Sequence, residues 1–285
     1  MVDIVAIIPL YNPGPGLREV VASIPVNIPV ILVDDGSSHG LETAIELVNT
    51  RPMLELLVSE ENRGIASALN LGMRAARSRL GGGGWLLTLD QDSRLPVGYM
   101  DEVRERLDAS FDQRCEADLY YPSHLNGVPQ AVRVGLRRSV QAVEPIQSGW
   151  VVRLTWPSGE WFFDESLVID GVDTDAYLRL IRQGGRVQSI PASLHHSLGT
   201  SSVLWGKTVS THNARRVYFM LRNRIFLMRR YSGVTPLWWR LNAWVIAVET
   251  LKAFAAGRRN HAYWLAIARG IRHGVSQEAS RYPSI

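Results

Sequence analysis

The chain has 285 residues, 46% of them hydrophobic and 20% charged, which is the composition of a globular protein and excludes a disordered or collagen-like chain. A single cysteine, Cys115, excludes an intramolecular disulfide framework and a zinc site built from cysteines. Residues 1–8 lack the basic start of a secretory signal, and no apolar, charge-free stretch of ~18 residues is present, so we expect a cytoplasmic protein without an ordinary transmembrane helix.

Charge is distributed unevenly along the chain, although the total is only +4. The residues after Gly206 contain 14 basic and two acidic side chains, a net charge of +12, whereas the first 206 residues carry −8. Five of the nine tryptophans lie in this last part or directly before it, at Trp205, Trp238, Trp239, Trp244 and Trp264. Basic, Trp-rich sequence is typical of contact with an anionic membrane surface, which we expect for this part of the chain.

The first 96 residues alternate between short apolar runs and segments with helical spacing. The apolar runs predict buried strands at residues 4–8, 30–33, 54–58 and 85–89. The segments between them predict helices at residues 17–24, 41–48 and 65–76. Short apolar strands separated by single helices predict an α/β fold, with a mostly parallel, Rossmann-like sheet flanked by helices.

A polar cluster follows each of these predicted strands. Ligands bind parallel sheets beyond the carboxyl ends of the strands, so we expect the four clusters to form one composite site. The clusters are Tyr11-Asn12, Asp34-Asp35, Glu60-Glu61-Asn62 and Asp90-Gln91-Asp92.

The pattern is less regular after residue 96. A charged amphipathic helix is predicted at residues 97–111 and several strands at residues 119–152. Further helices are predicted at residues 170–183, 218–230 and 237–254.

Asp90-Gln91-Asp92 follows an apolar strand directly. Residues i and i+2 project to the same side of an extended chain, so both carboxylates can face one point. Two hard oxygen ligands suit Mg²⁺ or Mn²⁺. Surface acids often produce a D-x-D pattern, but its position at the end of a buried strand favours a metal site.

Asp34-Asp35-Gly36-Ser37 also follows a strand and is interpreted in two ways. These residue types form turns, and a carboxylate here can also accept hydrogen bonds from a nucleobase or ribose. One aspartate can turn the chain while the other binds. The sequence contains no G-x-G-x-x-G after the first strand and no P-loop motif, which disfavours a dehydrogenase or a P-loop nucleotidase.

Four motifs occur in a distinctive order: IIPLYN at residues 7–12, VDDGS at 33–37, ENRGIA at 61–66 and LDQDS at 89–93. They resemble those of the inverting family 2 glycosyltransferases, which have the GT-A fold and use nucleotide-sugar donors. The Asp-Gln-Asp-Ser version resembles the bacterial rhamnosyltransferase branch. Later signatures agree, and the resemblance extends from residue 4 to about residue 230: QSG at 147–149, FDE at 163–165, IDGVDTD at 169–175, LHHSLG at 194–199 and the segment 216–223.

The resemblance implies a divalent metal, Mg²⁺ or Mn²⁺, bound by Asp90 and Asp92. It implies His196 as a third ligand, with the adjacent His195 as the alternative. The metal would neutralise the diphosphate of the donor.

The resemblance also implies Asp173 as the catalytic base, with Asp170 and Asp175 beside it as alternatives. Inverting transfer needs a carboxylate to take the proton of the acceptor hydroxyl. These aspartates have a structural interpretation too, because acidic residues compensate the dipole at the start of a helix.

Further residues are assigned to substrates by the same resemblance. The nucleotide-sugar would contact Pro9, Tyr11, Asn12, Asp34, Asp35, Asn62, Gly64, Asp90 and Gln91. The remaining expected substrate contacts are Gln147, Ser148, Gly149, Asp164, Glu165, Asp175 and Arg222. Arg222 and Arg224 could reach a diphosphate or lie on a solvated helix, and Asp164-Glu165 could position the acceptor or cap a turn.

The function expected from these observations is transfer of a sugar from dTDP-L-rhamnose to a glycan or lipid-linked glycan, in the synthesis of a bacterial surface polysaccharide such as O-antigen. The alternatives are a UDP-hexose or UDP-galactofuranose donor on the same fold, and a non-catalytic glycan- or membrane-binding protein. A nucleic-acid partner is disfavoured by the acidic strand-end site. No Gln-x-x-Arg-Trp motif of processive family members is present, so we expect transfer of one or a few sugars.

The expected catalytic domain comprises residues 1–206, with nucleotide-sugar binding in 1–96 and the acceptor and base region in 97–206. Residues 207–285 are expected to form a basic, Trp-rich helical segment that is membrane-associated or on the acceptor side. The apolar helix within it either packs on the catalytic domain or lies in the membrane interface, anchored by Trp238, Trp239 and Trp244. The protein would then be peripheral on the inner face of the cell membrane.

Overall fold

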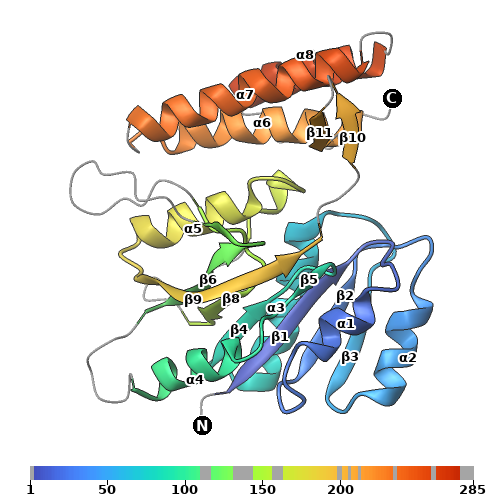
Figure 1. Ribbon diagram of the computed structural model, residues 1–285, viewed down its shortest axis with the longest axis vertical. Helices are drawn as coiled ribbons and strands as arrows, with labels where there is room; N and C mark the ends of the chain where they lie inside the picture. The colour runs from blue at the N-terminus through green and yellow to red at the C-terminus, as the bar shows by residue number, and fades with distance from the viewer. Residues whose placement is uncertain are drawn as a thin grey trace.

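The computed structural model describes residues 3–109, 117–130, 144–155, 163–197, 201–204, 207–210, 213–233, 236–257 and 261–276. Strands and helices alternate in its N-terminal part, as predicted (Figure 1). The elements are β1 (Ile4–Leu10), α1 (Leu17–Ala22), β2 (Val30–Asp34), α2 (Glu42–Thr50), β3 (Leu54–Val58), α3 (Ile65–Leu80) and β4 (Trp85–Thr88).

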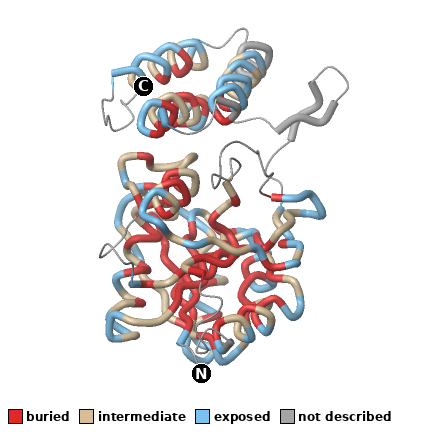
Figure 2. Tube along the Cα trace, turned by 90° about the vertical axis from the view of Figure 1, so that its left-hand side faces the viewer, coloured by how far each residue is buried: buried red, intermediate tan, exposed pale blue. Residues whose placement is uncertain are grey.

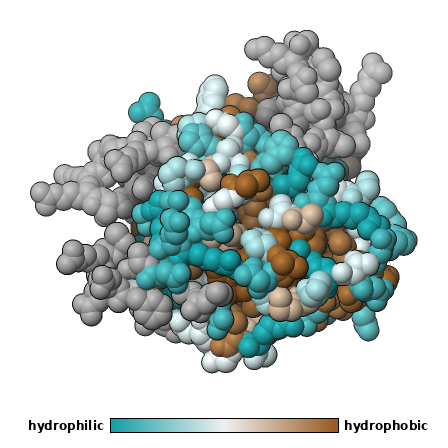
Figure 3. All heavy atoms as spheres, turned by 60° about the horizontal axis from the view of Figure 1, so that its bottom comes forward, coloured by the Kyte–Doolittle hydropathy of each residue, from teal (hydrophilic) through white to brown (hydrophobic). Residues whose placement is uncertain are grey.

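These four strands form the parallel part of the main sheet, in the order β3-β2-β1-β4. Every residue of β1 and β2 is buried, because helices cover both faces of the sheet. The strands therefore appear in the sequence as unbroken apolar runs. Their carboxyl ends point toward the C-terminal helices in Figure 1, while the face at the opposite end mixes hydrophilic and hydrophobic side chains (Figure 3).

The sheet becomes mixed beyond β4. There β8 (Trp150–Arg153) pairs antiparallel with β4, β6 (Leu119–Leu125) pairs antiparallel with β8, and β9 (Val187–His196) pairs parallel with β6. The end of β9 also pairs with β5 (Ser93–Arg94), which directly follows the polar turn after β4. The other elements of this region are α4 (Tyr99–Ala109), β7 (Val128–Pro129), the 3₁₀ helix η2 (Glu165–Leu167) and α5 (Val172–Arg182). The expected α/β fold with flanking helices is confirmed.

Two apolar clusters lie on the two faces of this sheet. One packs α1, α2 and α4 against it, and the other packs α3 and α5. On the second face, Gly72 of α3 lies against β1, where an added Cβ would come within 2.5 Å of Ile7 Cγ2. A residue larger than glycine would therefore push α3 away from the sheet.

Three helices form the C-terminal part: α6 (Ala214–Arg230), α7 (Pro236–Gly257) and α8 (His261–Ser276). They pack together beyond the carboxyl end of the sheet (Figures 1 and 2). The strands β10 (Ser201–Leu204) and β11 (Lys207–Ser210) precede them in the chain (Figure 1). Asn213 caps α6, since its Oδ1 accepts a hydrogen bond of 2.8 Å from Arg216 N.

Helix α8 lies in the segment that was expected to be helical, but the sequence pattern predicts no separate helix at its position. Gly270 and Gly274 weaken its helical signal, but they allow α8 to approach α6 closely. A Cβ at Gly270 would lie 2.9 Å from Tyr218 O, and one at Gly274 would lie 2.8 Å from Arg222 O. Close packing of two helix backbones explains why glycine occupies both positions.

The expectation of a tryptophan-anchored interfacial helix is wrong for Trp238. This residue is completely buried in the first turn of α7, whereas Trp239 and Trp244 are 36% and 68% exposed. Among the helices that the structure describes, none combines the length and the hydropathy needed to cross a bilayer.

Candidate active site

A cavity of about 890 Å³ opens at the carboxyl ends of β1 and β4, between the sheet and the C-terminal helices. Residues from the strand ends, from the start of α5, from the end of β9 and from α6 and α7 line it. Eleven of the site residues expected from the sequence are among them: Pro9, Tyr11, Asp35, Asn62, Gly64, Asp90, Gln91, Asp92, Gln147, Asp173 and His196.

The two aspartates after β2 have different positions. Asp35 lines the cavity, and its two carboxylate oxygens accept hydrogen bonds of 2.8 Å from Arg63 N and Gly64 N. Asp34 is buried and accepts bonds of 3.2 Å from Ser37 N. Asp34 therefore turns the chain and does not reach the cavity, which corrects its expected role at the nucleobase.

The loops after β1 and β4 are joined by Gln91. Its Oε1 accepts a bond of 2.8 Å from Tyr11 N, and its Nε2 donates a bond of 3.1 Å to Tyr11 O. Asn12 has a structural part in the same region, because its Oδ1 accepts a bond of 2.9 Å from Ser38 N and its side chain does not line the cavity. Tyr11, which is 46% exposed, stands at the cavity edge.

Asp90, Asp92 and His196 form a cluster in which one ligand atom of each residue lies within 4.8 Å of the others. Pairing of β5 with β9 positions the histidine: Ser93 lies opposite His196, and Ser93 Oγ is 2.8 Å from His196 Nδ1. Neighbouring residues of a strand face opposite sides, so His195 is exposed and does not line the cavity. Two carboxylates and an imidazole are a donor set that fits Mg²⁺ or Mn²⁺.

Residues behind the cluster hold Asp90 in place. Gln147 Nε2 donates to Asp90 Oδ1, and Ser148 Oγ accepts a bond of 3.0 Å from Asp90 N. Gly149 lies farther back, where its carbonyl accepts a bond of 2.6 Å from Tyr99 Oη. Gln147 thus lines the cavity, while Ser148 and Gly149 support it from outside the lining.

The electrostatics of the cluster favour a bound cation. Burial, together with the negative charges of Asp92 and Asp173, raises the pKa of Asp90 to about 7, although Gln147 and Arg216 act in the opposite direction. A cation would relieve this repulsion and allow Asp90 to ionise.

Asp173 lies in the first turn of α5 and faces the cavity. Its Oδ1 accepts a bond of 2.8 Å from Thr174 N. Burial raises the pKa of Asp173 and the charge of Asp170 adds to this, while Thr174 N–H and Arg224 act in the opposite direction. A carboxylate whose pKa is raised toward neutrality suits a general base. Asp170 differs, because its carboxylate pairs with Arg216 through two contacts of 3.2 Å.

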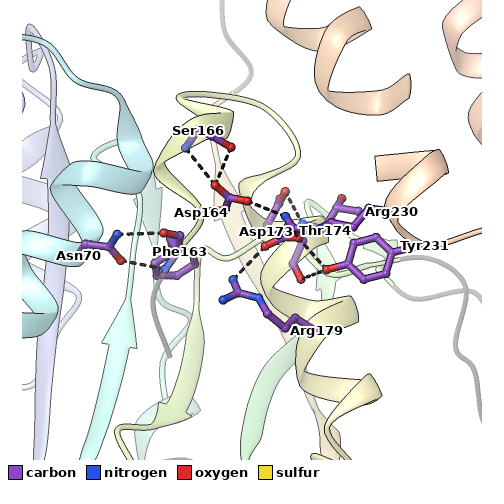
Figure 4. Close-up of polar contacts among 10 residues, drawn as sticks. Asn70, Phe163, Asp164, Ser166, Asp173, Thr174, Arg179, Arg230 and Tyr231 are labelled. Carbon is purple, nitrogen blue, oxygen red and sulfur yellow. Dashed lines mark hydrogen bonds and ion pairs between the residues drawn. The ribbon is translucent and has the colours of Figure 1, made fainter. Parts of the chain in front are cut away.

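Asp175 is turned away from the cavity and has no contact with it. Its completely buried carboxylate accepts bonds of 2.7 Å from Tyr231 Oη, 2.9 Å from Arg230 Nη1 and 2.9 Å from Arg179 Nη2. Figure 4 shows Arg179, Arg230 and Tyr231 converging beside the start of α5. This network ties α5 to α6, which corrects the expected substrate role of Asp175.

Three further expected substrate residues are also structural and do not line the cavity. Asp164 accepts a bond of 3.0 Å from Ser166 N and one of 2.6 Å from Arg230 Nη1 (Figure 4). Glu165 Oε1 accepts a bond of 2.8 Å from Asn70 Nδ2. Arg222 is buried and donates to Asn223 Oδ1 and to Ser166 O.

Arg222 lies outside the face of α6 that provides most of the cavity lining. Arg215 in the first turn of α6 lines the cavity, and five further lining residues of this helix, Arg216, Met220, Asn223, Arg224 and Leu227, share one face of a helix with 3.6 residues per turn. Arg222 lies six positions after Arg216 and therefore belongs to another face. The same periodicity, applied to the sequence, favours Arg216 and Arg224.

Asn223 holds a strained loop at the cavity wall. Its Nδ2 lies 2.7 Å from each of the carbonyl oxygens of Leu167, Ile169 and Asp170. Val168, between them, has φ 62° and ψ −66°, a conformation that is costly for a β-branched residue. A strained backbone conformation persists where several surrounding contacts hold it in place, as the bonds from Asn223 do here. This loop carries Asp170 and leads into Asp173.

Comparison with known proteins agrees with this geometry. Residues 5–114 match the model of the family described as "Glycosyl transferase family 2". The chain is similar to "dTDP-rhamnosyl transferase RfbF" of Shigella flexneri, with 28% identity over 248 residues that cover 80% of each protein.

Solved structures share the fold. S. aureus TarS superposes with a TM-score of 0.53 at 17% identity, over 79% of this chain and 40% of that one. TarS 1-349 in complex with UDP gives 0.51 at 17% identity, over 96% and 72%. GalNAc-T7 with UDP, GalNAc and Mn2+ gives 0.55 at 16% identity, over 96% and 55%. The resemblance of the sequence to family 2 glycosyltransferases and the GT-A type of its fold are confirmed.

Proposed function

We propose that this chain, whose residues 5–114 match glycosyl transferase family 2, is a metal-dependent inverting glycosyltransferase. Its donor would be dTDP-L-rhamnose and its acceptor a saccharide or lipid-linked saccharide of a bacterial surface polysaccharide. One observation carries the proposal: Asp173 and the Asp90–Asp92–His196 cluster line the same cavity. The similarity to a dTDP-rhamnosyl transferase supports the donor.

The residues of the cavity would act at two ends, one that holds the donor diphosphate and one that holds the acceptor. Asp90, Asp92 and His196 would hold the divalent metal, which offsets the charge that grows on the departing nucleoside diphosphate. Arg216 adds positive charge at this end, because its guanidinium is close enough to lower the pKa of Asp90. Asp173 would take the proton of the acceptor hydroxyl while that oxygen attacks the anomeric carbon.

Nucleotide preference is the first test of the proposed donor. With Mg²⁺ or Mn²⁺, we expect dTDP to raise the melting temperature more than UDP, GDP, CDP or NAD, and to do so only when the metal is present. A nucleotide at about 100 times its Kd adds about 2.7 kcal/mol of stability, a shift of a few degrees for a chain of this size. The shift is measured by thermal unfolding of the purified protein.

Two other results would change the proposal. A preference for UDP would keep the fold and the reaction type but move the donor to a UDP-hexose or UDP-galactofuranose. The UDP bound in the TarS and GalNAc-T7 structures makes this the principal competing donor class. No shift with any nucleotide, from folded protein, would favour a non-catalytic glycan- or membrane-binding protein.

We further propose that α7 and α8 rest on an anionic membrane surface, which would place the protein at the inner face of the cell membrane. Trp244 and Leu251 of α7 are 68% and 56% exposed, and Trp264 and Val275 of α8 are 41% and 54% exposed. Exposed tryptophan beside arginine is typical of contact with anionic lipid.

A double variant tests this membrane contact. Replacing both Trp244 and Trp264 by alanine should lower binding to phosphatidylglycerol-containing vesicles by about tenfold, because two large apolar side chains no longer leave water. Co-sedimentation with vesicles measures the binding, and pure phosphatidylcholine vesicles are the control. Unchanged sedimentation of the variant would contradict the contact. Deleting the whole tail is unsuitable, because α7 also contributes Asn242 to the cavity.

A further inference from the structure

Helix α7 reaches the end of the cavity that contains Asp173. Trp238, which is completely buried, donates a hydrogen bond of 2.5 Å from Nε1 to Glu144 Oε1. Asn242 lies one turn later, is 8% exposed and lines the cavity. Its Oδ1 accepts a bond of 2.7 Å from Arg224 Nη1, and its Nδ2 donates a bond of 2.9 Å to Trp238 O.

The two side chains held by α7, Glu144 and Arg224, both line the cavity. Their charges and that of Asp173 act on one another: burial raises the pKa of Glu144, the charge of Asp173 raises it further and that of Arg224 lowers it. Arg224 also acts on the pKa of Asp173. A fixed carboxylate and a fixed guanidinium therefore lie close to the expected base.

The chemistry of this end fits a neutral sugar. A carboxylate accepts hydrogen bonds from hydroxyls, and a guanidinium and an amide donate and accept them, while Ile146, Met220 and Leu227 provide apolar lining. A phosphate fits poorly, because Glu144 and Asp173 would repel it and Arg224 already donates to Asn242.

We propose that Glu144 and Arg224 form the acceptor-sugar subsite, with Trp238 and Asn242 as the residues that position them. The inference rests on the proposed function, because it requires Asp173 to receive its proton from a sugar hydroxyl bound here. It also gives α7 a place in the site, so that the C-terminal helices complete the catalytic domain.

Two conservative variants test the subsite. Glu144→Gln keeps an oxygen that can accept from Trp238 Nε1 but removes the carboxylate, and Asn242→Leu keeps the branched shape of the side chain but removes the bond to Arg224. Asn49→Leu on the exposed side of α2 is the matched control. Melting temperatures identify any variant that is poorly folded, and Trp238→Phe, which loses the indole donor and part of the ring but stays aromatic, then replaces it.

Two readouts separate the acceptor end from the donor end. The first is saturation-transfer NMR of methyl glycosides (rhamnoside, glucoside, galactoside and N-acetylglucosaminide) with protein, dTDP and Mg²⁺. The second is the affinity for dTDP in the presence of Mg²⁺, while slow release of dTDP from dTDP-L-rhamnose by water is followed in the wild type alone. We expect the wild type to bind at least one glycoside, both variants to bind it at least tenfold more weakly, and their affinity for dTDP to stay within twofold of the wild type.

Several outcomes would overturn the subsite. They are unchanged glycoside binding in both variants, an equal loss in Asn49→Leu, or no glycoside bound by the wild type. Failure of the proposed function is distinguishable, because it would appear as absence of dTDP binding and release in the wild type, whatever the glycosides do.

Discussion

Replacing Asp173 by asparagine is expected to lower turnover by about 10²–10⁴-fold, the contribution typical of a positioned general base. The asparagine amide has the same shape but cannot take a proton. Donor binding should stay near normal, because Asp173 lies on α5 and the nucleotide end is built from the strand-end loops. Steady-state kinetics and a dTDP titration measure the two effects, and a large loss of dTDP affinity would instead indicate a structural role.

The pH profile of the wild type gives a second test of the same residue. Since burial raises the pKa of Asp173, the basic form is lost at a higher pH than for an exposed aspartate. Turnover should therefore fall as the pH drops through this raised pKa and level off above it. Asp173→Asn should remove this limb from its residual activity.

Asp175→Asn is the contrasting variant. The two carboxylates are two residues apart, but Asp175 is bound by Arg179, Arg230 and Tyr231 and is shielded from the cavity. Removing this charge weakens the bonds from the buried Tyr231 and from the partly exposed Arg179 and Arg230, which we expect to cost about 2 kcal/mol of folding stability. A lower melting temperature with a nearly normal turnover per folded molecule would separate the structural aspartate from the catalytic one.

The first half of the fold could be predicted from the sequence because its strands are buried on both faces. Such strands appear as continuous apolar runs, and β1 and β2 are of this kind. By contrast β9 contains Pro191 and only two buried residues, so it carries little pattern that distinguishes it from a loop. Helix α8 was missed for a related reason, because its glycines satisfy packing against α6 rather than helix propensity.

The candidate site also has a part that could be predicted from the sequence and a part that could not. Residues at the ends of parallel strands, such as Asp35 and Asp90, could be predicted to meet because those ends share one edge of the sheet. Glu144 and Asn242 could not, since their places depend on how α7 packs against the domain. Sequence spacing alone does not determine whether Asp173 or Asp175 faces the cavity. The contacts that Arg230 and Tyr231 make with Asp175 determine it.

Replacing Asp92 by asparagine is expected to abolish metal-dependent transfer. Asp92 supplies one of three ligand atoms in the cluster, and its amide substitute is a weaker ligand without charge. Turnover is measured with and without Mg²⁺ or Mn²⁺, and metal binding by calorimetry. Unchanged turnover in the variant would remove Asp92 from the metal site.

The same substitution should make the metal-free protein more stable, although it abolishes metal-dependent transfer. The pKa of Asp90 is raised to about 7 in the folded chain, well above its value when unfolded, so the folded state binds a proton that the unfolded state releases. Its contribution to stability is complete below about pH 4 and is lost as the pH rises through about 7. Asp92→Asn removes a negative charge that raises this pKa, so the metal-free variant should melt at a higher temperature than the metal-free wild type at pH 8.

Added Mg²⁺ or Mn²⁺ should stabilise the wild type more strongly at pH 8 than at pH 6, because at pH 6 the ion must displace the proton of Asp90. Equal metal stabilisation at both pH values would show that Asp90 is not a ligand.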